Sequence, residues 1–432
     1  MSCNRSCSYC FAKEKLHSYS KPDSVREMSL ENLDAAMLFL AKSNQDTIQL
    51  AGGEPTIHSK FKEIVLKLLS NNMRVNVLSN ALWDPGLNDF FAQISPLSLG
   101  FLLNIDHPKT YTPAEWTKIE KNLSFLKSRS NITLSFNIRE AVPDYSYIFE
   151  LISKYGFKFL RLSFSMPVRF DDRKNSYLPI AEYKNAAKYV VDFIRKAEAL
   201  GAKAGMDNAV PICMFTAEEL NELMLKQVIE PARNFVCYPA IDIGPDLSIW
   251  RCFGTSKLFN KKLSDFSDLL EVYDYYERVS RLYQFKFFPL EECASCNYGK
   301  EEKCQGGCIG FAESKAEELG REVSDLSDEK LFEAKPRLAK EVVLRRYQLP
   351  REAVTLQLPN GNEIEIPKIA TSLILQLDGE TSVKKSLAHS LWGNSASEES
   401  DGLDDCLLEL SGKKVLPIIR RLLEQKALVT TA

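Results

Sequence analysis

The segment Cys3-Asn4-Arg5-Ser6-Cys7-Ser8-Tyr9-Cys10 places three cysteines within eight residues, in the spacing C-x3-C-x2-C. Three thiolates at this spacing can bind three corners of a cube-shaped 4Fe–4S cluster. Such a cluster normally takes four cysteines, so one iron keeps an open position for a substrate or cofactor. The alternative is a zinc site, but zinc knuckles favour C-x2-C pairs with a fourth ligand nearby, and His17 is the only candidate close to the triad.

A second motif, Gly52-Gly53-Glu54-Pro55, follows a predicted strand at residues 47–50. Two adjacent glycines let the backbone approach a ligand closely, and the Glu54 carboxylate can pair with an ammonium group. The four residues alone are a weak signal. Their distance from the cysteine triad and their place at a strand end make the combination a strong one.

The triad and the Gly-Gly-Glu-Pro motif together resemble those of the radical S-adenosylmethionine (SAM) enzymes. The resemblance covers residues 3 to about 215. It implies that Cys3, Cys7 and Cys10 hold a 4Fe–4S cluster whose open iron chelates the methionine part of SAM. One electron then cleaves the sulfonium to a 5′-deoxyadenosyl radical, which abstracts a hydrogen atom from the substrate.

The same resemblance implies a set of residues that contact SAM. They are Tyr9 at the adenine, Gly52, Gly53, Glu54 and Pro55 at the methionine amino group, Asn80 where relatives often carry Thr-Asn-Gly, and Asn104 at the ribose. For Asn104, a solvated polar strand end is an equally open alternative.

Predicted strands alternate with predicted helices between residues 25 and 215. The strands are residues 47–50, 74–78, 99–105, 132–138, 157–164 and 202–215, and helices are expected after Ser29 and Thr112 and at 59–70, 145–154 and 180–199. This alternation predicts right-handed βαβ units around a parallel sheet, an α/β fold. The resemblance implies that this fold is a partial (β/α)6 radical SAM barrel. In the family the first barrel strand precedes the triad. Only two residues do so here, so either the barrel lacks that strand or the start codon lies further upstream, and we expect a frayed or open first edge.

The composition is that of an ordinary globular protein, with 432 residues, 45% of them apolar and 26% charged. At roughly 100–200 residues per domain, two or three domains are expected. The 55 Lys and Arg balance 58 Asp and Glu, which argues against a nucleic-acid partner because phosphate binding needs a basic excess. No apolar run approaches the ~20 residues that cross a bilayer, and the first residues lack a signal peptide's apolar core. We expect a cytoplasmic protein with no membrane partner.

The chain contains eleven cysteines, which without a secretory signal point to metal clusters rather than disulfides. The second group is Cys237, Cys252, Cys293, Cys296, Cys304 and Cys308. It resembles the SPASM extension of peptide-modifying radical SAM enzymes, which carries auxiliary 4Fe–4S clusters. Two arrangements stay open. Cys237, Cys252 and Cys308 hold one cluster and the other three hold another, or Cys237, Cys252, Cys293 and Cys296 hold a single cluster, as in the shorter twitch relatives. Zinc is a further alternative.

The SPASM pattern usually has seven cysteines, and the second group departs from it at three points. Seven residues rather than five separate Cys296 from Cys304, Leu247 stands at a glycine position, and no seventh cysteine is evident, since Cys406 lies in the C-terminal module. We expect Cys213 and Cys406 to be small buried hydrophobic residues, the usual role of a free cysteine. The alternative for Cys213 is hydrogen-atom donation to a substrate radical. Asp106 and His107 can act as bases, but Asp-His-Pro at a strand end more often serves a turn.

The C-terminal module begins with a hairpin pattern. Residues 354–358 and 364–366 alternate around Asn360-Gly361, which predicts a β-hairpin, and helices are expected at 368–377, 382–391 and 413–424. This order predicts a winged helix similar to modules that bind leader peptides by adding a strand to a sheet edge. The acidic loop 395–405 disfavours DNA, the other ligand of such modules.

The predicted domains follow from these patterns. They are a radical SAM partial barrel (1–215), a SPASM/twitch-like auxiliary iron–sulfur domain (216–312), a helical linker (313–345) and a winged-helix module (346–432). Residues 230–310 are expected to form short segments with little helical periodicity.

The first functional hypothesis is a radical SAM enzyme that modifies a ribosomally made peptide by a thioether, a carbon–carbon crosslink or an epimerisation. It would use SAM, its 4Fe–4S cluster, one or two auxiliary 4Fe–4S clusters, and a flavodoxin or ferredoxin-type reductant. The alternatives are a small-molecule dehydrogenase, a maturase that oxidises a protein side chain, and a non-catalytic zinc protein. Sulfatase-type maturases carry an Asp after the cysteine that matches Cys252, and Phe253 stands there in this chain.

Overall fold

The computed structural model describes most of the N-terminal three quarters of the chain and five later strands. The described residues are 1–170, 173–230, 234–257, 261–286, 289–300, 303–318, 336–338, 343–346, 354–357, 363–366, 419 and 428–430. Contacts divide the chain into two compact units, Met1–Glu322 and Val323–Ala432.

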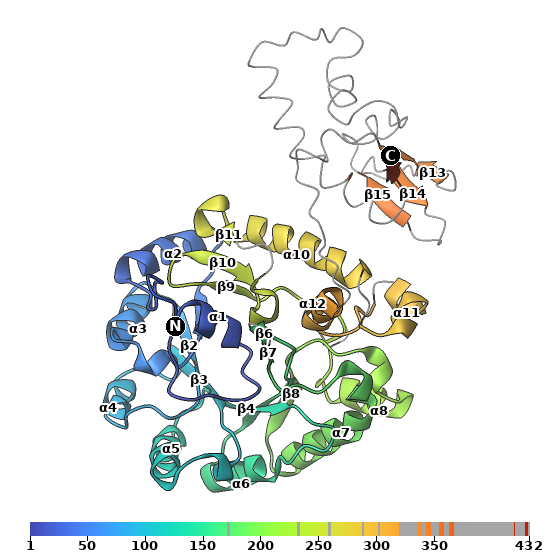
Figure 1. Cartoon of the computed structure of the whole chain (residues 1–432). Helices are drawn as coiled ribbons and strands as arrows, with labels where there is room; N and C mark the ends of the chain where they lie inside the picture. The colour runs from blue at the N-terminus through green and yellow to red at the C-terminus, as the bar shows by residue number, and fades with distance from the viewer. Residues whose placement is uncertain are drawn as a thin grey trace, which may run out of the picture. The chain divides into compact units, whose positions relative to one another are not determined.

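A parallel sheet of six strands forms the centre of the first unit (Figure 1). The strands are β1 (Thr47–Leu50), β2 (Arg74–Ser79), β3 (Leu99–Asn104), β4 (Ile132–Ile138), β5 (Phe159–Phe164) and β8 (Lys203–Met206). They lie side by side in that order, and every neighbouring pair is parallel. The predicted α/β fold is confirmed. Among the described strands β1 pairs with β2 alone, so it forms an edge, as the sequence led us to expect.

Helices connect the strands and surround the sheet (Figure 1). They are α1 (Lys13–Ser18), α2 (Leu30–Lys42), α3 (Phe61–Ser70), α4 (Leu87–Ala92), α5 (Pro113–Leu126), α6 (Ser146–Tyr155), α7 (Tyr183–Ala199) and α8 (Ala217–Leu225), with 3-10 turns η1 (Pro55–Ile57), η2 (Pro108–Thr110), η3 (Ile180–Glu182) and η4 (Ile212–Met214). The starts of two helices follow from local chemistry. The Ser29 hydroxyl accepts the Asn32 N–H at 3.1 Å, and Thr112 forms a capping box with Glu115 ahead of Pro113.

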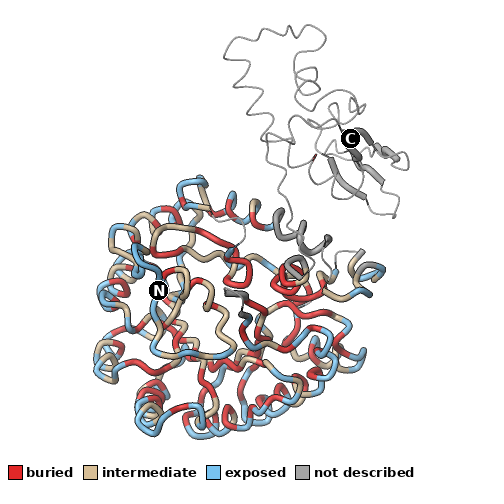
Figure 2. Tube along the Cα trace, in the orientation of Figure 1, coloured by how far each residue is buried: buried red, intermediate tan, exposed pale blue. Residues whose placement is uncertain are grey.

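The helices bury one face against the sheet. On α3 the buried residues are Phe61, Ile64, Val65 and Leu68, the i, i+3, i+4, i+7 spacing of an amphipathic helix. The strands they cover are apolar, with Val75 and Val77 of β2 buried. Buried positions accordingly line the inside of the ring of helices, and exposed positions line its outside (Figure 2).

A small antiparallel sheet follows the barrel segments. It consists of β9 (Ile241–Ile243), β10 (Ser248–Arg251) and β11 (Lys261–Lys262), in the order β11-β10-β9. Trp250 of the central strand β10, and Phe253 just after it, pack with Ala12 and Tyr19 of the N-terminal segment. The cysteine-rich region therefore packs directly on the segment that follows the triad.

Three expectations for these segments were wrong. The strand expected at 202–215 ends at Met206, and the chain turns into η4, where Pro211 has no N–H to donate to a sheet. The region 230–310 contains an eighteen-residue helix, α10 (Leu269–Lys286), whose buried Leu269, Val272 and Tyr276 follow helical spacing. The helix expected to run to residue 345 is α12 (Ile309–Glu318), and residues 336–338 and 343–346 are strands.

Short elements complete the first unit. They are the hairpin β6 (Arg169–Phe170) with β7 (Arg173–Lys174), η5 (Phe253–Thr255), η6 (Leu263–Asp265), η7 (Glu291–Ala294) and α11 (Asn297–Lys300). None of the helices within the described residues is long and apolar enough to cross a membrane.

The second unit contains two antiparallel sheets. One has the order β13 (Val343–Arg346), β14 (Val354–Gln357) and β15 (Glu363–Ile366), and the other pairs β12 (Pro336–Leu338) with β16 (Leu428–Thr430). The predicted hairpin is confirmed, because Val354 pairs with Ile366 and Gln357 with Glu363. The three helices of the predicted winged helix lie outside the described residues, apart from Ile419, and the winged helix stays a prediction.

Asn122 of α5 provides a test of the barrel's packing. Its side chain is fully buried, donates to the carbonyl oxygens of Ala81 and Trp83 at 2.9 and 3.0 Å, and accepts from Asn88. Asn122→Leu keeps the shape but leaves these buried groups unpaired, which should lower the free energy of unfolding by about 2–3 kcal/mol. Urea unfolding followed by circular dichroism measures it. The exposed neighbour Lys121 is the control, and an equal loss in Lys121→Leu would contradict the assignment.

Candidate functional site

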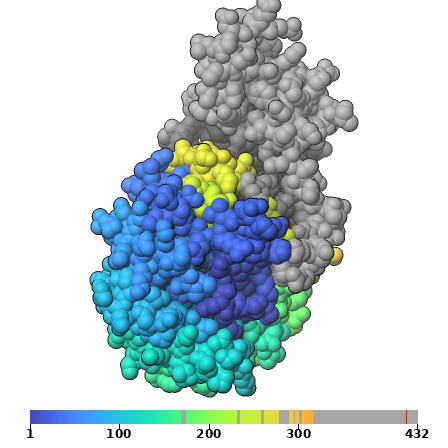
Figure 3. Space-filling model, turned by 60° about the vertical axis from the view of Figure 1, so that its left-hand side comes forward, coloured from blue at the N-terminus to red at the C-terminus, as the bar shows by residue number. Residues whose placement is uncertain are grey.

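The cysteine triad lies in a loop fastened to the ends of the parallel strands. The Asn4 side chain donates to the Leu82 carbonyl at 3.0 Å and accepts from the Asn80 side chain at 2.8 Å, just beyond β2. The Cys10 N–H donates to the Cys7 carbonyl at 3.3 Å and closes a turn within the triad. The N-terminal segment lies among the early barrel segments on this face of the molecule (Figure 3).

The three thiols of the triad share one electrostatic environment. Burial raises the pKa of Cys3, Cys7 and Cys10, the last to about 11, and Cys7 further raises the pKa of both its partners. Backbone N–H groups at Cys3 and Cys10, and the Arg5 guanidinium at Cys7, act in the opposite direction. Thiolates crowded together and held by N–H donors need positive charge at their centre. This donor set fits an iron–sulfur cluster.

The spacing of the cysteines differs from that of a mononuclear site. Within the described part of the chain, no three His, Cys, Asp or Glu side chains are placed to hold a single metal ion. A zinc ion holds its thiolates at about 2.3 Å, whereas a cluster binds each thiolate to a different iron and accepts a wider spacing.

A buried carboxylate holds the other side of the triad loop. Asp106, at the end of β3, lies 3.6 Å from the Arg5 guanidinium and 3.1 Å from that of Arg139. Arg5 also stacks on Tyr111, whose hydroxyl accepts the Asp106 N–H at 2.9 Å. Asp106 is thus an anchor rather than the turn residue we expected.

His107 and Tyr9 border this anchor. His107 does serve a turn, because its Nδ1 accepts the Lys109 N–H at 3.1 Å. The Tyr9 ring lies 4.8 Å from the Arg139 guanidinium, which places it against the same charged group.

The glycines of the second motif allow the N-terminal segment to pass. A Cβ on Gly53 would lie 1.8 Å from the Ser2 carbonyl oxygen, and Gly52 has a φ of +131° beside the Met1 side chain. The Glu54 N–H donates to the same Ser2 oxygen at 2.8 Å. From the sequence, the two glycines were expected to let a ligand approach the backbone. In the structure their immediate neighbour is the chain's own segment before Cys3.

The Glu54 carboxylate is buried and already holds four hydrogen bonds. Its Oε1 accepts from the Thr56 N–H, the Thr56 hydroxyl and the Ser79 hydroxyl, and its Oε2 accepts from the Asn80 N–H at 2.8 Å. Burial raises its pKa, and these donors oppose the rise. Since Oε2 has one partner here and a carboxylate oxygen accepts about two, one position stays available for an ammonium group.

A pocket of about 730 Å³ lies between the ends of the parallel strands and the antiparallel sheet. Of the residues predicted to contact SAM, it is lined by Tyr9, Gly52, Gly53, Glu54 and Pro55. Asn80 and Asn104 are not among its lining residues. Asn137 of β4 lines the pocket and donates to the Asn104 side chain at 3.2 Å, so Asn104 lies behind it.

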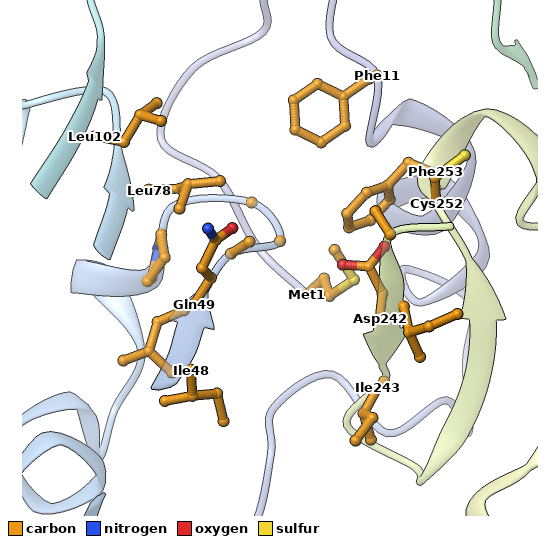
Figure 4. A pocket seen from close by; sticks show the side chains of 18 of the residues that line it. Met1, Phe11, Ile48, Gln49, Leu78, Leu102, Asp242, Ile243, Cys252 and Phe253 are labelled. Atoms are coloured by element: carbon orange, nitrogen blue, oxygen red, sulfur yellow. The ribbon is translucent and has the colours of Figure 1, made fainter. Parts of the chain in front are cut away.

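The opposite wall of the pocket carries groups that were not expected there from the sequence. Asp242, Cys252 and Phe253 lie there, across from Gln49 and Leu78 of the barrel (Figure 4). Burial raises the pKa of Asp242 to about 7, with Lys15 opposing the rise. Asp242 is half-buried and lines the cavity. The only sequence signal was the alternation Ile241-Asp242-Ile243, in which the Asp points away from its apolar neighbours.

The later cysteines fall into two sets. In the first set, the buried Arg251 guanidinium lies 3.2 Å from Cys237 Sγ and 4.0 Å from Cys252 Sγ. The pKa of Cys237 is lowered, and the largest cause is its hydrogen bond with the Cys308 thiol. In the second, the thiols of Cys304 and Cys296 raise the pKa of Cys293 beyond the effect of burial. This grouping is that of the first arrangement left open above. Cys213 is exposed, so the expectation that it is a buried hydrophobic residue was wrong.

The close approach of the N-terminal segment to Gly53 can be tested by adding a side chain at this residue. Gly53→Ala places a methyl group on the Ser2 carbonyl, which should displace residues 1–3 and lower the free energy of unfolding by about 1–3 kcal/mol. Urea unfolding measures the loss, and limited proteolysis near the N-terminus should become faster. Gly205→Ala is the control, since nothing lies within 4 Å of its added Cβ. Equal behaviour of the two variants contradicts the close approach.

Asp242 predicts a pH dependence of stability. Its pKa is about 7 in the folded chain but near 3.9 in an unfolded one, so the folded state holds a proton that the unfolded state has lost. Stability from this group is complete below about pH 4 and is lost as the pH rises through 7. Asp242→Asn should therefore gain stability relative to the parent between pH 5 and pH 8, measured by urea unfolding. The exposed Asp89→Asn should show no such gain, and a flat difference for Asp242→Asn would refute the raised pKa.

Comparisons with known proteins agree with this architecture. The sequence matches the family model of the radical SAM superfamily over residues 2–226. A comparison with curated proteins gives no match. Among solved structures, anSMEcpe with bound AdoMet is similar, with a TM-score of 0.51 and 18% identity over 74% of this chain and 92% of that chain.

Two further structures share the fold. The same anSMEcpe with bound AdoMet and Cp18Cys peptide gives a TM-score of 0.50 and 18% identity over 74% of this chain and 92% of that chain. SuiB from Streptococcus suis bound to S-adenosylmethionine gives 0.51 and 15% identity over 75% of this chain and 74% of that chain. With the cysteine triad at the strand ends and a family match over more than half its length, the chain belongs to the radical SAM superfamily.

Proposed function

We propose that this enzyme cleaves SAM reductively and uses the product to abstract a hydrogen atom from a ribosomally made peptide. The observation that carries the proposal is the placement of the triad beside a pocket of about 730 Å³. A pocket of this volume is typical of small-molecule sites. It extends from Gly52–Pro55, proposed to hold SAM, across to Asp242 and Phe253, where a side chain of the substrate would enter.

We assign each proposed ligand-binding residue one role. Cys3, Cys7 and Cys10 hold the cluster. Glu54 Oε2 binds the methionine amino group of SAM, and Tyr9 lies at the adenine. Asn80 and Asn104 support the SAM site from outside the pocket lining, Asn104 through its contact with Asn137. When bound, SAM and the reduced cluster supply a 5′-deoxyadenosyl radical, and the protein supplies orientation and the exclusion of water. The electron would come from a flavodoxin or ferredoxin-type protein.

Two observations favour a peptide as the substrate. The fold is shared with anSMEcpe, a structure of which holds the Cp18Cys peptide together with AdoMet. In the second unit, β13, β14 and β15 form an antiparallel sheet, in which β13 and β15 are edge strands among the described residues. An extended leader peptide can add a strand to such an edge, as the predicted winged-helix module would require.

Asp242 is the proposed proton acceptor at the substrate. Its carboxylate faces the pocket, and no carboxylate follows Cys252, where Phe253 stands. Modifications that oxidise a substrate carbon release a proton, which a buried carboxylate with a pKa of about 7 can accept near neutral pH. The later cysteines would hold one or two auxiliary clusters that accept the electron.

Substitution of the triad tests the cleavage of SAM. In anaerobically reconstituted protein with dithionite, Cys7→Ala should lower the rate of 5′-deoxyadenosine formation by more than about 100-fold, since the loss of a cluster ligand exceeds the effect of losing an outer partner. Liquid chromatography measures the product. Ser6→Ala, an exposed neighbour in the same loop, should keep the parent rate. Unchanged cleavage by Cys7→Ala would overturn the proposal.

Isotope transfer tests the substrate class. A peptide encoded beside the gene, uniformly deuterated, should pass deuterium into 5′-deoxyadenosine and leave with an altered mass. If deuterium is transferred from a small alcohol or amine and none from the peptide, the substrate is a small molecule and not a peptide. A colourless, zinc-loaded protein that forms no 5′-deoxyadenosine would contradict both enzymatic hypotheses, the one with a peptide substrate and the one with a small-molecule substrate.

A further inference from the structure

Cys213 is the one described cysteine that belongs to neither group of predicted ligands. It lies in η4, after the last strand of the parallel sheet, 80 residues before Cys293. Its side chain is exposed, which is unusual for an unmodified free cysteine. The surroundings of η4 explain the position.

The backbone brings η4 to the loop that carries the later cysteines. The Val210 N–H donates to the Asn234 carbonyl at 2.8 Å, and the Gln305 N–H donates to the next carbonyl, that of Phe235, at 2.9 Å. Residues 234–235 thus join the segment before Cys213 to the segment after Cys304. A Cβ on Gly307 would lie 3.3 Å from Pro211 Cδ, so the two segments also touch directly.

Three other thiols share this corner. A Cβ on Gly306 would lie 3.4 Å from Cys293 Sγ, and the Gly306 N–H donates to Cys304 Sγ at 3.4 Å. A Cβ on Gly299 would lie within 4.0 Å of Cys296 Cβ and of the carbonyl oxygens of Cys293 and Cys304. The two glycines therefore let the loop fold tightly around these thiols.

Electrostatics couples Cys213 to the same set. Burial first and then the Cys304 thiol raise the pKa of Cys213, with a smaller contribution from Cys296. The Cys213 thiol in turn raises the pKa of Cys293. Cys213 therefore lies within electrostatic range of the other thiols of this corner.

We propose that Cys213 is the fourth thiolate of a closed iron–sulfur cluster site with Cys293, Cys296 and Cys304. This rests on the proposed function only in taking the auxiliary metal to be an iron–sulfur cluster. On binding, each thiol releases its proton and its sulfur binds one iron, so a cube is fully ligated and no electron is transferred. The missing seventh cysteine is thereby supplied from before the cysteine-rich region rather than from after it.

The assignment separates the roles of the two sets. A closed four-thiolate cluster has no iron free for substrate and can serve electron transfer. Cys237, Cys252 and Cys308 remain as a three-cysteine set beside the buried Arg251, and Cys252 lines the pocket. An open iron, if that set holds a cluster, would lie on the pocket side.

Metal content tests the proposal. The background is the triple variant Cys3→Ala, Cys7→Ala, Cys10→Ala, reconstituted anaerobically, so that any iron measured is auxiliary. Adding Cys213→Ala should leave one iron of that cluster without its thiolate. This should change one signal in the electron paramagnetic resonance spectrum of the reduced protein and increase the iron lost to a chelator, by up to about four irons per chain. Cys406→Ala in the same background should leave both unchanged. An unchanged spectrum with unchanged iron retention in the Cys213 variant, an effect of the Cys406 variant, or zinc in place of iron overturns the proposal.

Thiol footprinting of the unsubstituted chain does not depend on the folding of a variant. N-ethylmaleimide should label the exposed Cys213 in apoprotein, and reconstitution should protect it together with Cys293, Cys296 and Cys304, as read by peptide mass spectrometry. Equal labelling of Cys213 before and after reconstitution overturns the proposal. SAM cleavage, assayed with the N-terminal triad intact, reports separately on the proposed function.

Discussion

The contact between the N-terminal segment and the first strand end is the constraint on which the rest of the site depends. The Ser2 carbonyl lies against Gly53 and accepts the Glu54 N–H at 2.8 Å. One residue later Cys3 begins the triad, and the Asn4 side chain bonds to that of Asn80 at 2.8 Å. These contacts fix the cysteine loop to the parallel sheet, and the sheet gives it a rigidity that a short exposed loop lacks by itself.

Charge fixes the other half of that loop. Arg5 reaches the Cys7 thiol and the buried Asp106 at once, and Arg139 completes the neutralisation of Asp106 from the end of β4. The two guanidinium groups compensate a buried carboxylate that would be costly if it were left unpaired. The same network positions the Tyr9 ring, which lies on Arg139.

Features that depend on neighbours in sequence were predictable, and features that depend on distant segments were not. Ser29 and Thr112 cap helices as expected, because a cap acts over three residues. Helix α10 was missed although the spacing of its buried residues was visible. Asp242 and Cys213 could not be assigned, since each meets its partners across a fold that joins segments many residues apart.

The antiparallel sheet ties the far wall of the pocket to the triad. Tyr19, just after α1, donates its hydroxyl to Asp246 at 2.8 Å, and Asn32 of α2 donates to the Pro245 carbonyl at 2.8 Å. Helix α1 begins three residues after Cys10. A displacement of the antiparallel sheet would therefore be passed through Tyr19 and α1 to the triad and would move it. Hydrogen abstraction requires reacting atoms in near contact. In the function proposed above, the distance between a substrate at Asp242 and the triad would therefore be set by this packing.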